Sequence, residues 1–248
     1  MGKIVAIGGG ENGRPGTKYE TGPFDKRIVS LTGKNQPTFL FIGLANKFAD
    51  SYFAVMDGIY NGKYGCKTEY LTENDIKVPE ISSLKIASAD IIYVGGGNTL
   101  RLMNLLRKYK IDKMLKDAYS SDKVLCGVSA GAICWCDFGN SESRKLTSGS
   151  KQTIKIKGIG LIHILLCPHF NDGEKRKNDL PRMMKSTYKI PAVALDNGTA
   201  LEILDRKFRI INSIEGALAQ KFYWKNGVYR SDVIEQNVYR DIDELYER

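Results

Sequence analysis

Histidine is scarce in this 248-residue sequence, which has two, and long apolar runs are missing. No stretch approaches the roughly 20 consecutive apolar residues that cross a bilayer, so a membrane-spanning protein is not expected. Residues 1–5 lead straight into an apolar segment without a secretory signal, which makes the cytoplasm the default location. Two histidines and dispersed thiols give no cluster of metal ligands. We therefore expect a protein that needs neither a metal nor another cofactor.

Cysteine is also sparse, and its five residues lie apart in apolar stretches: Cys66, Cys126, Cys134, Cys136 and Cys167. An odd number of scattered cysteines is typical of reduced, buried thiols. The net charge of +9 raises the question of nucleic-acid binding. The basic residues are spread along the chain, however, and the densest run, 174–177, carries no recognition motif. A generally basic surface that helps to attract acidic substrates is the better interpretation.

Strands and helices alternate over the first two-thirds of the chain. Apolar strands are predicted at 3–8, 38–43, 67–71, 89–94 and around 124, and helices at 24–32, 50–64, 99–107 and 110–119. Apolar strands without polar alternation, separated by helices, indicate a parallel sheet covered by helices on both faces. Ligands of such sheets bind beyond the carboxyl ends of the strands.

The pattern changes after Ser129. Residues 137–151 are polar and predict a loop, 160–167 predict a strand, and 176–189 predict a helix broken near Pro181. From residue 192 onward, short strands separated by turns predict a β-rich C-terminal portion. No repeat, low-complexity tract or linker interrupts the chain, so we expect a single α/β domain over 1–248.

The segment Gly127-Val128-Ser129-Ala130-Gly131 follows a short apolar strand and precedes a stretch that can begin a helix. That context is typical of a nucleophile elbow. Small flanking residues let the chain fold back on itself, and the serine hydroxyl then projects beside the free N–H groups of the helix start. Gly-x-Ser-x-Gly also occurs in ordinary glycine-rich turns, so the hypothesis that Ser129 is a nucleophile depends on the rest of the chain.

Two further glycine-rich segments follow predicted strands. Residues 8–13 match Gly-x-Gly-x-x-Gly, but the loop continues and no acidic residue ends the next strand, so we interpret it as an active-site loop rather than a dinucleotide site. Residues 95–98 precede a helix and are suited to bind an anion, either a phosphate or an oxyanion. With a serine elbow nearby we favour an oxyanion hole, formed by the N–H of Gly96 or Gly97 and that of Ala130.

The two histidines narrow the choice of a general base. His163 lies inside an apolar run, as a satisfied core or edge histidine does, whereas His169 ends that run, where it can meet the serine. We therefore predict His169 as the base. Three acids compete to orient its ring, and residue chemistry alone does not choose among them: Asp137, Glu142 and Asp196.

Four blocks in this order resemble the peptidase S51 family, which contains aspartyl dipeptidase (peptidase E) and cyanophycinase. They are Ile-Gly-Gly-Gly-Glu at 7–11, Val-Gly-Gly-Gly-Asn-Thr at 94–99, Gly-Val-Ser-Ala-Gly-Ala at 127–132 and Cys-Pro-His-Phe at 167–170. Leu-Asp-Asn-Gly-Thr-Ala at 195–200 resembles a later family block. The resemblance implies a flavodoxin-like sheet, similar to that of class I glutamine amidotransferases, and a Ser-His-acid triad.

The same resemblance implies residue roles. It assigns Ser129 as nucleophile, His169 as base and an acid within 137–143, an aspartate in peptidase E and a glutamate in cyanophycinase. Glu142 is our choice, since 140–143 occupies the matching segment. In peptidase E an arginine after the catalytic histidine holds the substrate's N-terminal aspartate. Arg176, or failing that Arg182, is expected in this role, and the predicted substrate-binding residues are Arg176, Asn98 and Asn171.

We therefore expect a serine exopeptidase that cleaves small peptides with an N-terminal aspartate. The alternatives are cyanophycin hydrolysis and a catalytically silent member of the superfold that binds a ligand or partner. The expected partner is a small peptide substrate, with neither nucleic acid nor a membrane. The sequence does not decide between a monomer and a homodimer.

Overall fold

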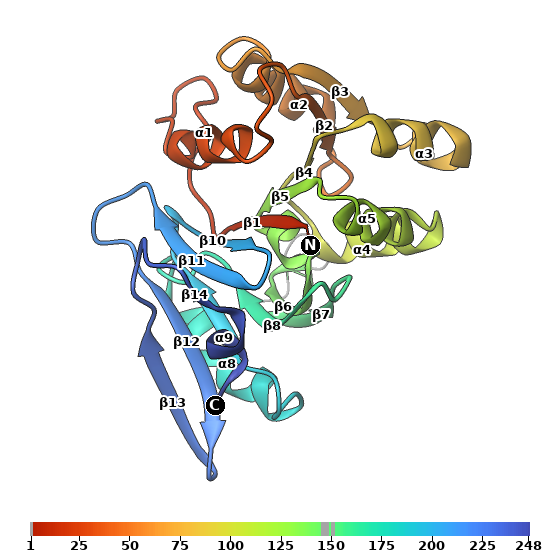
Figure 1. Ribbon diagram of the computed structural model, residues 1–248. Coiled ribbons are helices and arrows are strands. Elements are labelled where there is room, and N and C mark those ends of the chain that lie inside the picture. The colour runs from red at the N-terminus through yellow and green to blue at the C-terminus, as the bar shows by residue number, and fades with distance from the viewer. Residues whose placement is uncertain (1, 145–148, 150–151) are drawn as a thin grey trace.

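Two β-sheets flanked by helices make up the part of the chain that the computed structural model describes, residues 2–144, 149 and 152–248 (Figure 1). The larger sheet has the order β14-β11-β10-β1-β5-β4-β2-β3. Its parallel strands are β1 (Lys3–Ile7), β2 (Thr38–Ile42), β3 (Lys67–Leu71), β4 (Ile91–Val94) and β5 (Val124–Val128). Three antiparallel strands extend it beyond β1, namely β10 (Thr199–Leu204), β11 (Lys207–Asn212) and β14 (Arg240–Asp241).

Helices cover both faces of the parallel strands. Successive strand residues point to opposite faces, so Ile4 of β1 enters one hydrophobic core and Val5 enters the other. The core of Val5 is closed by α1 (Gly22–Ser30) and α2 (Ala49–Tyr60). The core of Ile4 is closed by α3 (Pro79–Ser88), α4 (Thr99–Lys108) and α5 (Ile111–Ser120), and a short 3-10 helix, η1 (Asp75–Lys77), precedes α3.

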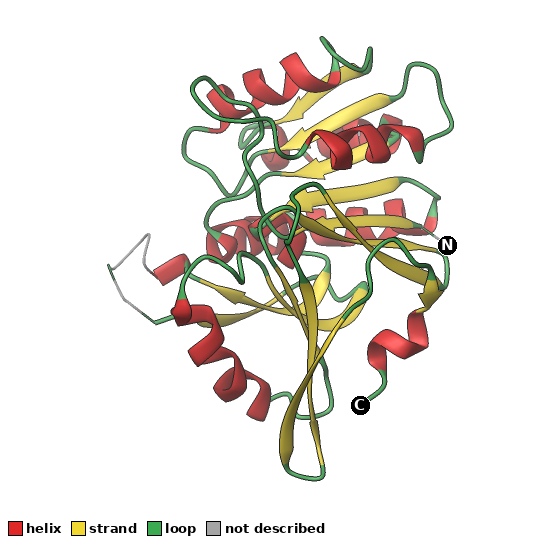
Figure 2. Ribbon diagram, turned by 90° about the vertical axis from the view of Figure 1, so that its left-hand side faces the viewer, coloured by secondary structure: helices red, strands yellow, loops and turns green. Residues whose placement is uncertain are grey.

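The smaller sheet has the order β13-β12-β9-β8-β6-β7. Its strands are β6 (Cys136–Ser141), β7 (Ile154–Lys157), β8 (Ile162–Cys167), β9 (Ala192–Leu195), β12 (Ala219–Lys225) and β13 (Val228–Val233). Figure 2 shows the β12–β13 hairpin extending away from the larger sheet. Helix α8 (Glu174–Lys185) packs against the smaller sheet through Leu180, Met183 and Met184, and α9 (Ile242–Tyr246) lies near the C-terminus.

The predicted parallel sheet with helices on both faces is confirmed, as is the β-rich C-terminal portion. The five parallel strands lie in the order β3-β2-β4-β5-β1, so the N-terminal strand lies between the rest of the parallel strands and the antiparallel extension. Helix α3, which lies between β3 and β4, was not among the predicted helices.

Two predictions for the segment after Ser129 were wrong. Residues 137–141 belong to β6 rather than to a loop, because the polar side chains of Asn140 and Ser141 are buried and hydrogen-bonded. Part of that predicted loop, 145–148 and 150–151, lies outside the described residues. Helix α8 runs through Pro181 without a break. Its buried apolar face stabilises the helix more than the single hydrogen bond that the proline removes.

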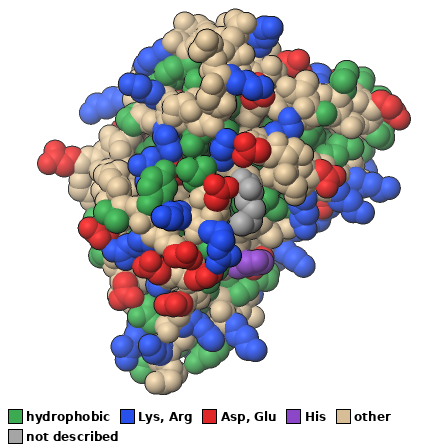
Figure 3. Space-filling model, viewed as in Figure 1, with side chains coloured by type: hydrophobic (Ala, Val, Ile, Leu, Met, Phe, Trp, Pro, Cys, Tyr) green, Lys and Arg blue, Asp and Glu red, His purple; other side chains and the backbone are tan. Residues whose placement is uncertain are grey.

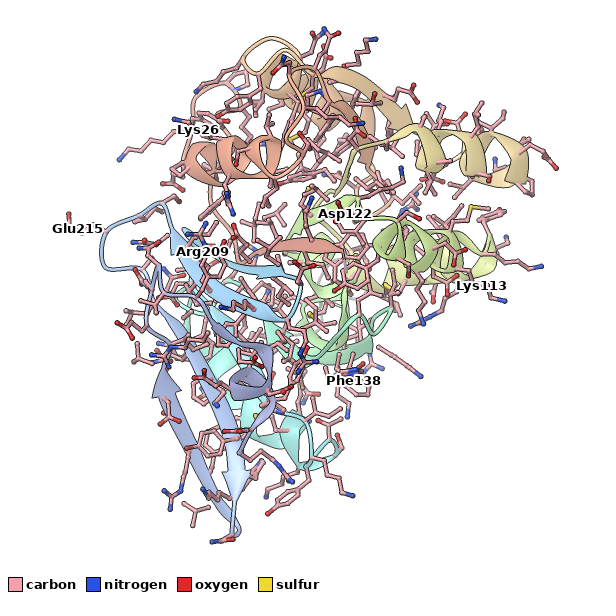
Figure 4. All side chains as sticks on the ribbon, in the orientation of Figure 1. Lys26, Lys113, Asp122, Phe138, Arg209 and Glu215 are labelled. Atoms are coloured by element: carbon pink, nitrogen blue, oxygen red, sulfur yellow. The ribbon has the colours of Figure 1, made fainter. Side chains whose placement is uncertain are left out.

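Buried Glu202 of β10 joins the larger sheet to α1. Its carboxylate accepts hydrogen bonds from Arg27 at 2.7 Å and from Arg209 at 3.1 Å, and the Tyr239 hydroxyl donates to it as well. Arg209 is labelled on β11 in Figure 4. Because Glu202 is fully buried, its two cations replace the water that the charge loses on folding.

The surface carries both signs of charge. On the face in Figure 3, lysine and arginine side chains are dispersed, with aspartate and glutamate between them. Among the described residues, no helix is both long and apolar enough to cross a bilayer.

Candidate active site

Ser129 occupies a sharp turn between β5 and a four-residue helix, α6 (Ala130–Ile133). Its φ of 55° and ψ of −108° are a strained conformation for a residue with a side chain. The glycines on either side are required by crowding, since a Cβ on Gly131 would lie 1.9 Å from the carbonyl oxygen of Val94, and one on Gly127 2.6 Å from the same atom. The segment thus has the strand-turn-helix geometry of a nucleophile elbow.

A cavity of about 270 Å³ lies at this elbow. It brings together residues from four separate parts of the chain: Gly97 and Thr99, Ser129 and Ile133, the segment 140–143, and Pro168, His169, Asp172 and Arg176. Ser129, His169, Glu142 and Arg176 were all singled out in the sequence and share this cavity. Ser129 and the ring of His169 make no direct hydrogen bond with each other among the described contacts, and such bonds are often long without substrate.

His169 follows the end of β8, and several contacts fix its backbone and ring. Its φ is 53°, and its N–H donates to the carbonyl oxygen of Gly8 at 3.1 Å. The ring nitrogen Nδ1 lies 2.6 Å from Oδ1 of Asn197. An amide oxygen only accepts, so Nδ1 carries the hydrogen and Nε2 keeps the lone pair that a general base needs. Burial lowers the pKa of His169, which outweighs the opposite effect of the Asn197 hydrogen bond.

Asn197 follows the end of β9, the strand paired in parallel with β8. Its own N–H donates to Oδ1 of Asn171 at 2.9 Å. Gly9 leaves room for the contact between Asn197 and His169, because a Cβ at this position would lie 2.0 Å from Oδ1 of Asn197 and 2.4 Å from Nδ1 of His169. Asn197 was not among the predicted partners of the ring, which were all carboxylates, although it lies in the segment 195–200 that resembles a family block.

Among the described contacts, none of the three predicted acids forms a hydrogen bond with Nδ1 of His169. Glu142 lies in the cavity, where its carboxylate is 3.6 Å from Nζ of Lys175 and 3.9 Å from a guanidinium nitrogen of Arg176. Asp137 is bonded to His163 at 3.2 Å, on the exposed side of β8, and Asp196 accepts from the N–H of Leu218. Glu142 was expected to contact this nitrogen of the histidine ring, but Asn197 occupies that position.

The predicted oxyanion donors lie next to the nucleophile. A Cβ on Gly96 would be 3.6 Å from Cβ of Ser129, and Gly97 lines the cavity. The N–H of Ser129 itself donates to the carbonyl oxygen of Ile7 and is occupied. The backbone of Gly96 interacts with the hydroxyl of Tyr52. We therefore prefer the N–H groups of Gly97 and Ala130 as the donors for an oxyanion.

The predicted substrate-binding residues have different environments. Arg176 is buried, lines the cavity and donates to the carbonyl oxygen of Asn140 at 2.8 Å, whereas Arg182 is exposed and pairs with Asp179. Asn98 caps α4, with its Oδ1 accepting from the N–H of Arg101, and lies outside the cavity lining. Asn171 supports Asn197 and is likewise outside the lining. Oδ1 of each asparagine already accepts a backbone hydrogen bond, and their assignment to substrate binding stays a prediction.

The chain is similar to known proteins in both sequence and fold. The sequence pattern of peptidase family S51 matches residues 4–211. The chain is 30% identical to the uncharacterized peptidase YgaJ of Bacillus subtilis over 226 residues, 89% of this chain and 92% of that one. It is 24% identical to peptidase E of Shewanella denitrificans over 199 residues, 77% of this chain and 81% of that one.

Solved structures share the fold. The crystal structure of a peptidase from an acI-B1 actinobacterium covers 97% of each chain with a TM-score of 0.70 at 18% identity. A putative peptidase E from Listeria monocytogenes covers 86% of this chain and 98% of its own, with a TM-score of 0.63 at 17% identity. The family pattern spans most of the sequence, so the chain belongs to peptidase family S51.

Proposed function

We propose that the protein is a serine peptidase that removes an acidic N-terminal residue from dipeptides. The observation that carries this proposal is the strained Ser129 sharing one cavity with His169, whose ring is held by Asn197. Oγ of Ser129 attacks the scissile carbonyl carbon while Nε2 of His169 takes the hydroxyl proton. The C–N bond then breaks, and the same proton passes to the leaving nitrogen. Water hydrolyses the resulting acyl-enzyme by the reverse proton path.

Asn197 fixes the ring without supplying charge. A carboxylate in this place would stabilise the imidazolium that forms during attack, whereas an amide oxygen selects the tautomer and the orientation alone. Burial keeps His169 neutral in the resting protein. The base is therefore ready to accept a proton at neutral and mildly acidic pH.

Arg176 supports the preference for an acidic residue. Its guanidinium donates to a backbone carbonyl at 2.8 Å and forms a long ion pair with Glu142 at 3.9 Å. A carboxylate at the end of a short side chain can accept a charge-assisted hydrogen bond from it. Asp172 and Glu142 also line the cavity and can accept hydrogen bonds from the substrate's free amino group. Relatives called peptidase E support this substrate class.

A panel of dipeptides tests the proposal. We expect kcat/KM for Asp-Leu to exceed that for Leu-Leu and Ala-Leu by roughly a hundredfold, as a shielded charge-assisted pair permits. Equal rates for the three peptides would remove the acidic preference. No cleavage of any peptide, together with no labelling of Ser129 by a fluorophosphonate, would instead indicate a catalytically silent protein.

A further inference from the structure

A second and larger cavity, of about 770 Å³, adjoins the one that contains Ser129. Gly97 lines both cavities, and Gly96 and Val128 line the larger one. A Cβ on Gly96 would lie 3.6 Å from Cβ of Ser129, so the nucleophile, which lines the smaller cavity, lies close to a residue that lines the larger one. A substrate whose scissile carbon reaches Ser129 can therefore extend in two directions.

The larger cavity lies at the point in the sheet where the helices that follow neighbouring strands change from one face to the other. Neighbouring parallel strands β2 and β4 are followed by helices on opposite faces, α2 in the core of Val5 and α4 in the core of Ile4. The loops that leave the two strands contribute Asn46 and Gly96 to the cavity. A crevice at the carboxyl ends of diverging strands is the usual ligand site of an open α/β sheet.

The same cavity also approaches the general base. Gly9 lies against His169 and Asn197, and the next residue, Gly10, lines the larger cavity. In peptide hydrolysis the base delivers its proton to the leaving nitrogen, so the leaving residue must lie on a side that the histidine reaches. The position of Gly10 is consistent with such a role for the larger cavity.

One wall of the cavity is apolar and consists of α2 residues. Tyr52, Ala54 and Val55 contribute to it, and the solvent-exposed ring of Phe48 stands just before the helix. Exposed aromatic rings beside a cavity are typical of ligand-binding surfaces. Tyr52 remains a neutral phenol, because burial raises its pKa to about 12.

The loop after β1 adds a positive charge to this apolar cavity. Arg14 lines it and pairs with Glu11 at 3.1 Å, with the two side chains 61% and 42% exposed. An ion pair this exposed contributes little free energy, so a substrate carboxylate can compete for the guanidinium. An apolar wall and one cation match an amino acid with an apolar side chain and a free α-carboxylate.

We propose that the larger cavity binds the leaving residue of the substrate, with its apolar side chain against the α2 wall and its C-terminal carboxylate on Arg14. This assignment rests on the proposed peptidase activity and adds the chemical class of the second residue. The preferred substrates are then dipeptides with an acidic first residue and a large apolar second residue.

A cavity-filling variant tests the apolar wall. The unmutated protein should cleave Asp-Leu and Asp-Phe at least about tenfold better in kcat/KM than Asp-Ser or Asp-Lys, in line with hydrophobic pockets elsewhere. Ala54→Trp fills the cavity from an exposed position and should remove most of this preference. Ala87→Trp, at an exposed alanine of α3 just before β4 begins and so at the opposite edge of the sheet, is the matched control and should change nothing.

A charge variant tests the carboxylate site. Arg14→Gln should lower kcat/KM for Asp-Leu about tenfold, mainly through KM, and leave the C-terminal amide of Asp-Leu unaffected. Lys18→Gln removes an exposed charge from the same loop and should have no such effect.

Equal cleavage of apolar and polar second residues by the unmutated protein would overturn the assignment, as would Ala54→Trp behaving like Ala87→Trp. The comparison uses whichever first residue is cleaved best, so it does not depend on the acidic preference. Labelling of Ser129 by a small fluorophosphonate should persist in Ala54→Trp. Absence of labelling in the unmutated protein would instead overturn the peptidase proposal itself, and the cavity assignment with it.

Discussion

Nδ1 of His169 and Oδ1 of Asn197 lie 2.6 Å apart beyond the carboxyl ends of two paired strands, β8 and β9. The contact fixes which ring nitrogen carries the hydrogen, and it does so without a negative charge. Gly9 is forced to be a glycine by this pair, since any Cβ there would overlap both side chains. We therefore propose that the triad expected from the family resemblance consists, in this chain, of a serine, a histidine and a neutral orienting residue.

Replacing Asn197 separates its orienting role from a merely structural one. Asn197→Ala frees the ring and should lower kcat/KM about a hundredfold, the cost of a misplaced catalytic group. Asn197→Asp restores an acceptor but adds a negative charge beside the imidazolium, which raises the pKa of His169. The acidic limb of the kcat/KM profile should then move to higher pH. If the acidic limb of the kcat/KM profile did not move in Asn197→Asp, the contact between residue 197 and the ring of His169 would be contradicted.

The unmutated protein should remain active under mildly acidic conditions. Burial lowers the pKa of His169 below its ordinary value of 6.5, so the ring takes up its inactivating proton only at lower pH. The acidic limb of kcat/KM should therefore have its midpoint below pH 6.5, as measured with Asp-Leu across a pH series. A midpoint above 6.5 would mean that the ring is more easily protonated than its burial implies.

Arg176 should determine the acidic preference. Arg176→Gln removes the cation and should reduce the advantage of Asp-Leu over Ala-Leu from roughly a hundredfold to a few-fold. Arg182→Gln is the matched control, since that arginine lies on the same helix but is exposed and paired with Asp179. If the preference for Asp-Leu were lost in Arg182→Gln and kept in Arg176→Gln, Arg182 rather than Arg176 would bind the acidic residue.

The stability of the fold should depend on Glu202, which lies outside the cavity that contains Ser129. Burial raises the pKa of this carboxylate, but its hydrogen bonds with Arg27, Tyr239 and Arg209 outweigh burial and lower it overall. Glu202→Gln should lower the free energy of unfolding by about 2 kcal/mol at neutral pH. This is less than the cost of breaking a fully buried ion pair, because the two arginines are partly solvated. The difference should shrink as the pH falls below 4.5, where the unfolded carboxylate binds a proton. Exposed Glu235→Gln should change stability by less than about 0.5 kcal/mol, as urea unfolding can measure.

The sequence was sufficient for those parts of the molecule that local patterns determine. Apolar runs such as 38–43 identified the parallel strands, and crowding around Gly127 and Gly131 follows from the elbow motif. Asn197 was not predictable in this way, because it lies 28 residues from His169 in sequence and approaches it only through the pairing of β8 with β9. The β6 strand was missed because its buried polar residues Asn140 and Ser141 make hydrogen bonds that only the fold creates.

Covalent labelling of Ser129 tests the central claim most directly. Intact-protein mass spectrometry after treatment with a small fluorophosphonate should show one adduct on the unmutated chain, and peptide mapping should place it on Ser129. Ser129→Ala should show none, and His169→Ala should label at least about a hundredfold more slowly while remaining folded. Absence of an adduct on the unmutated chain, or equal labelling rates with and without His169, would contradict a serine nucleophile activated by this histidine.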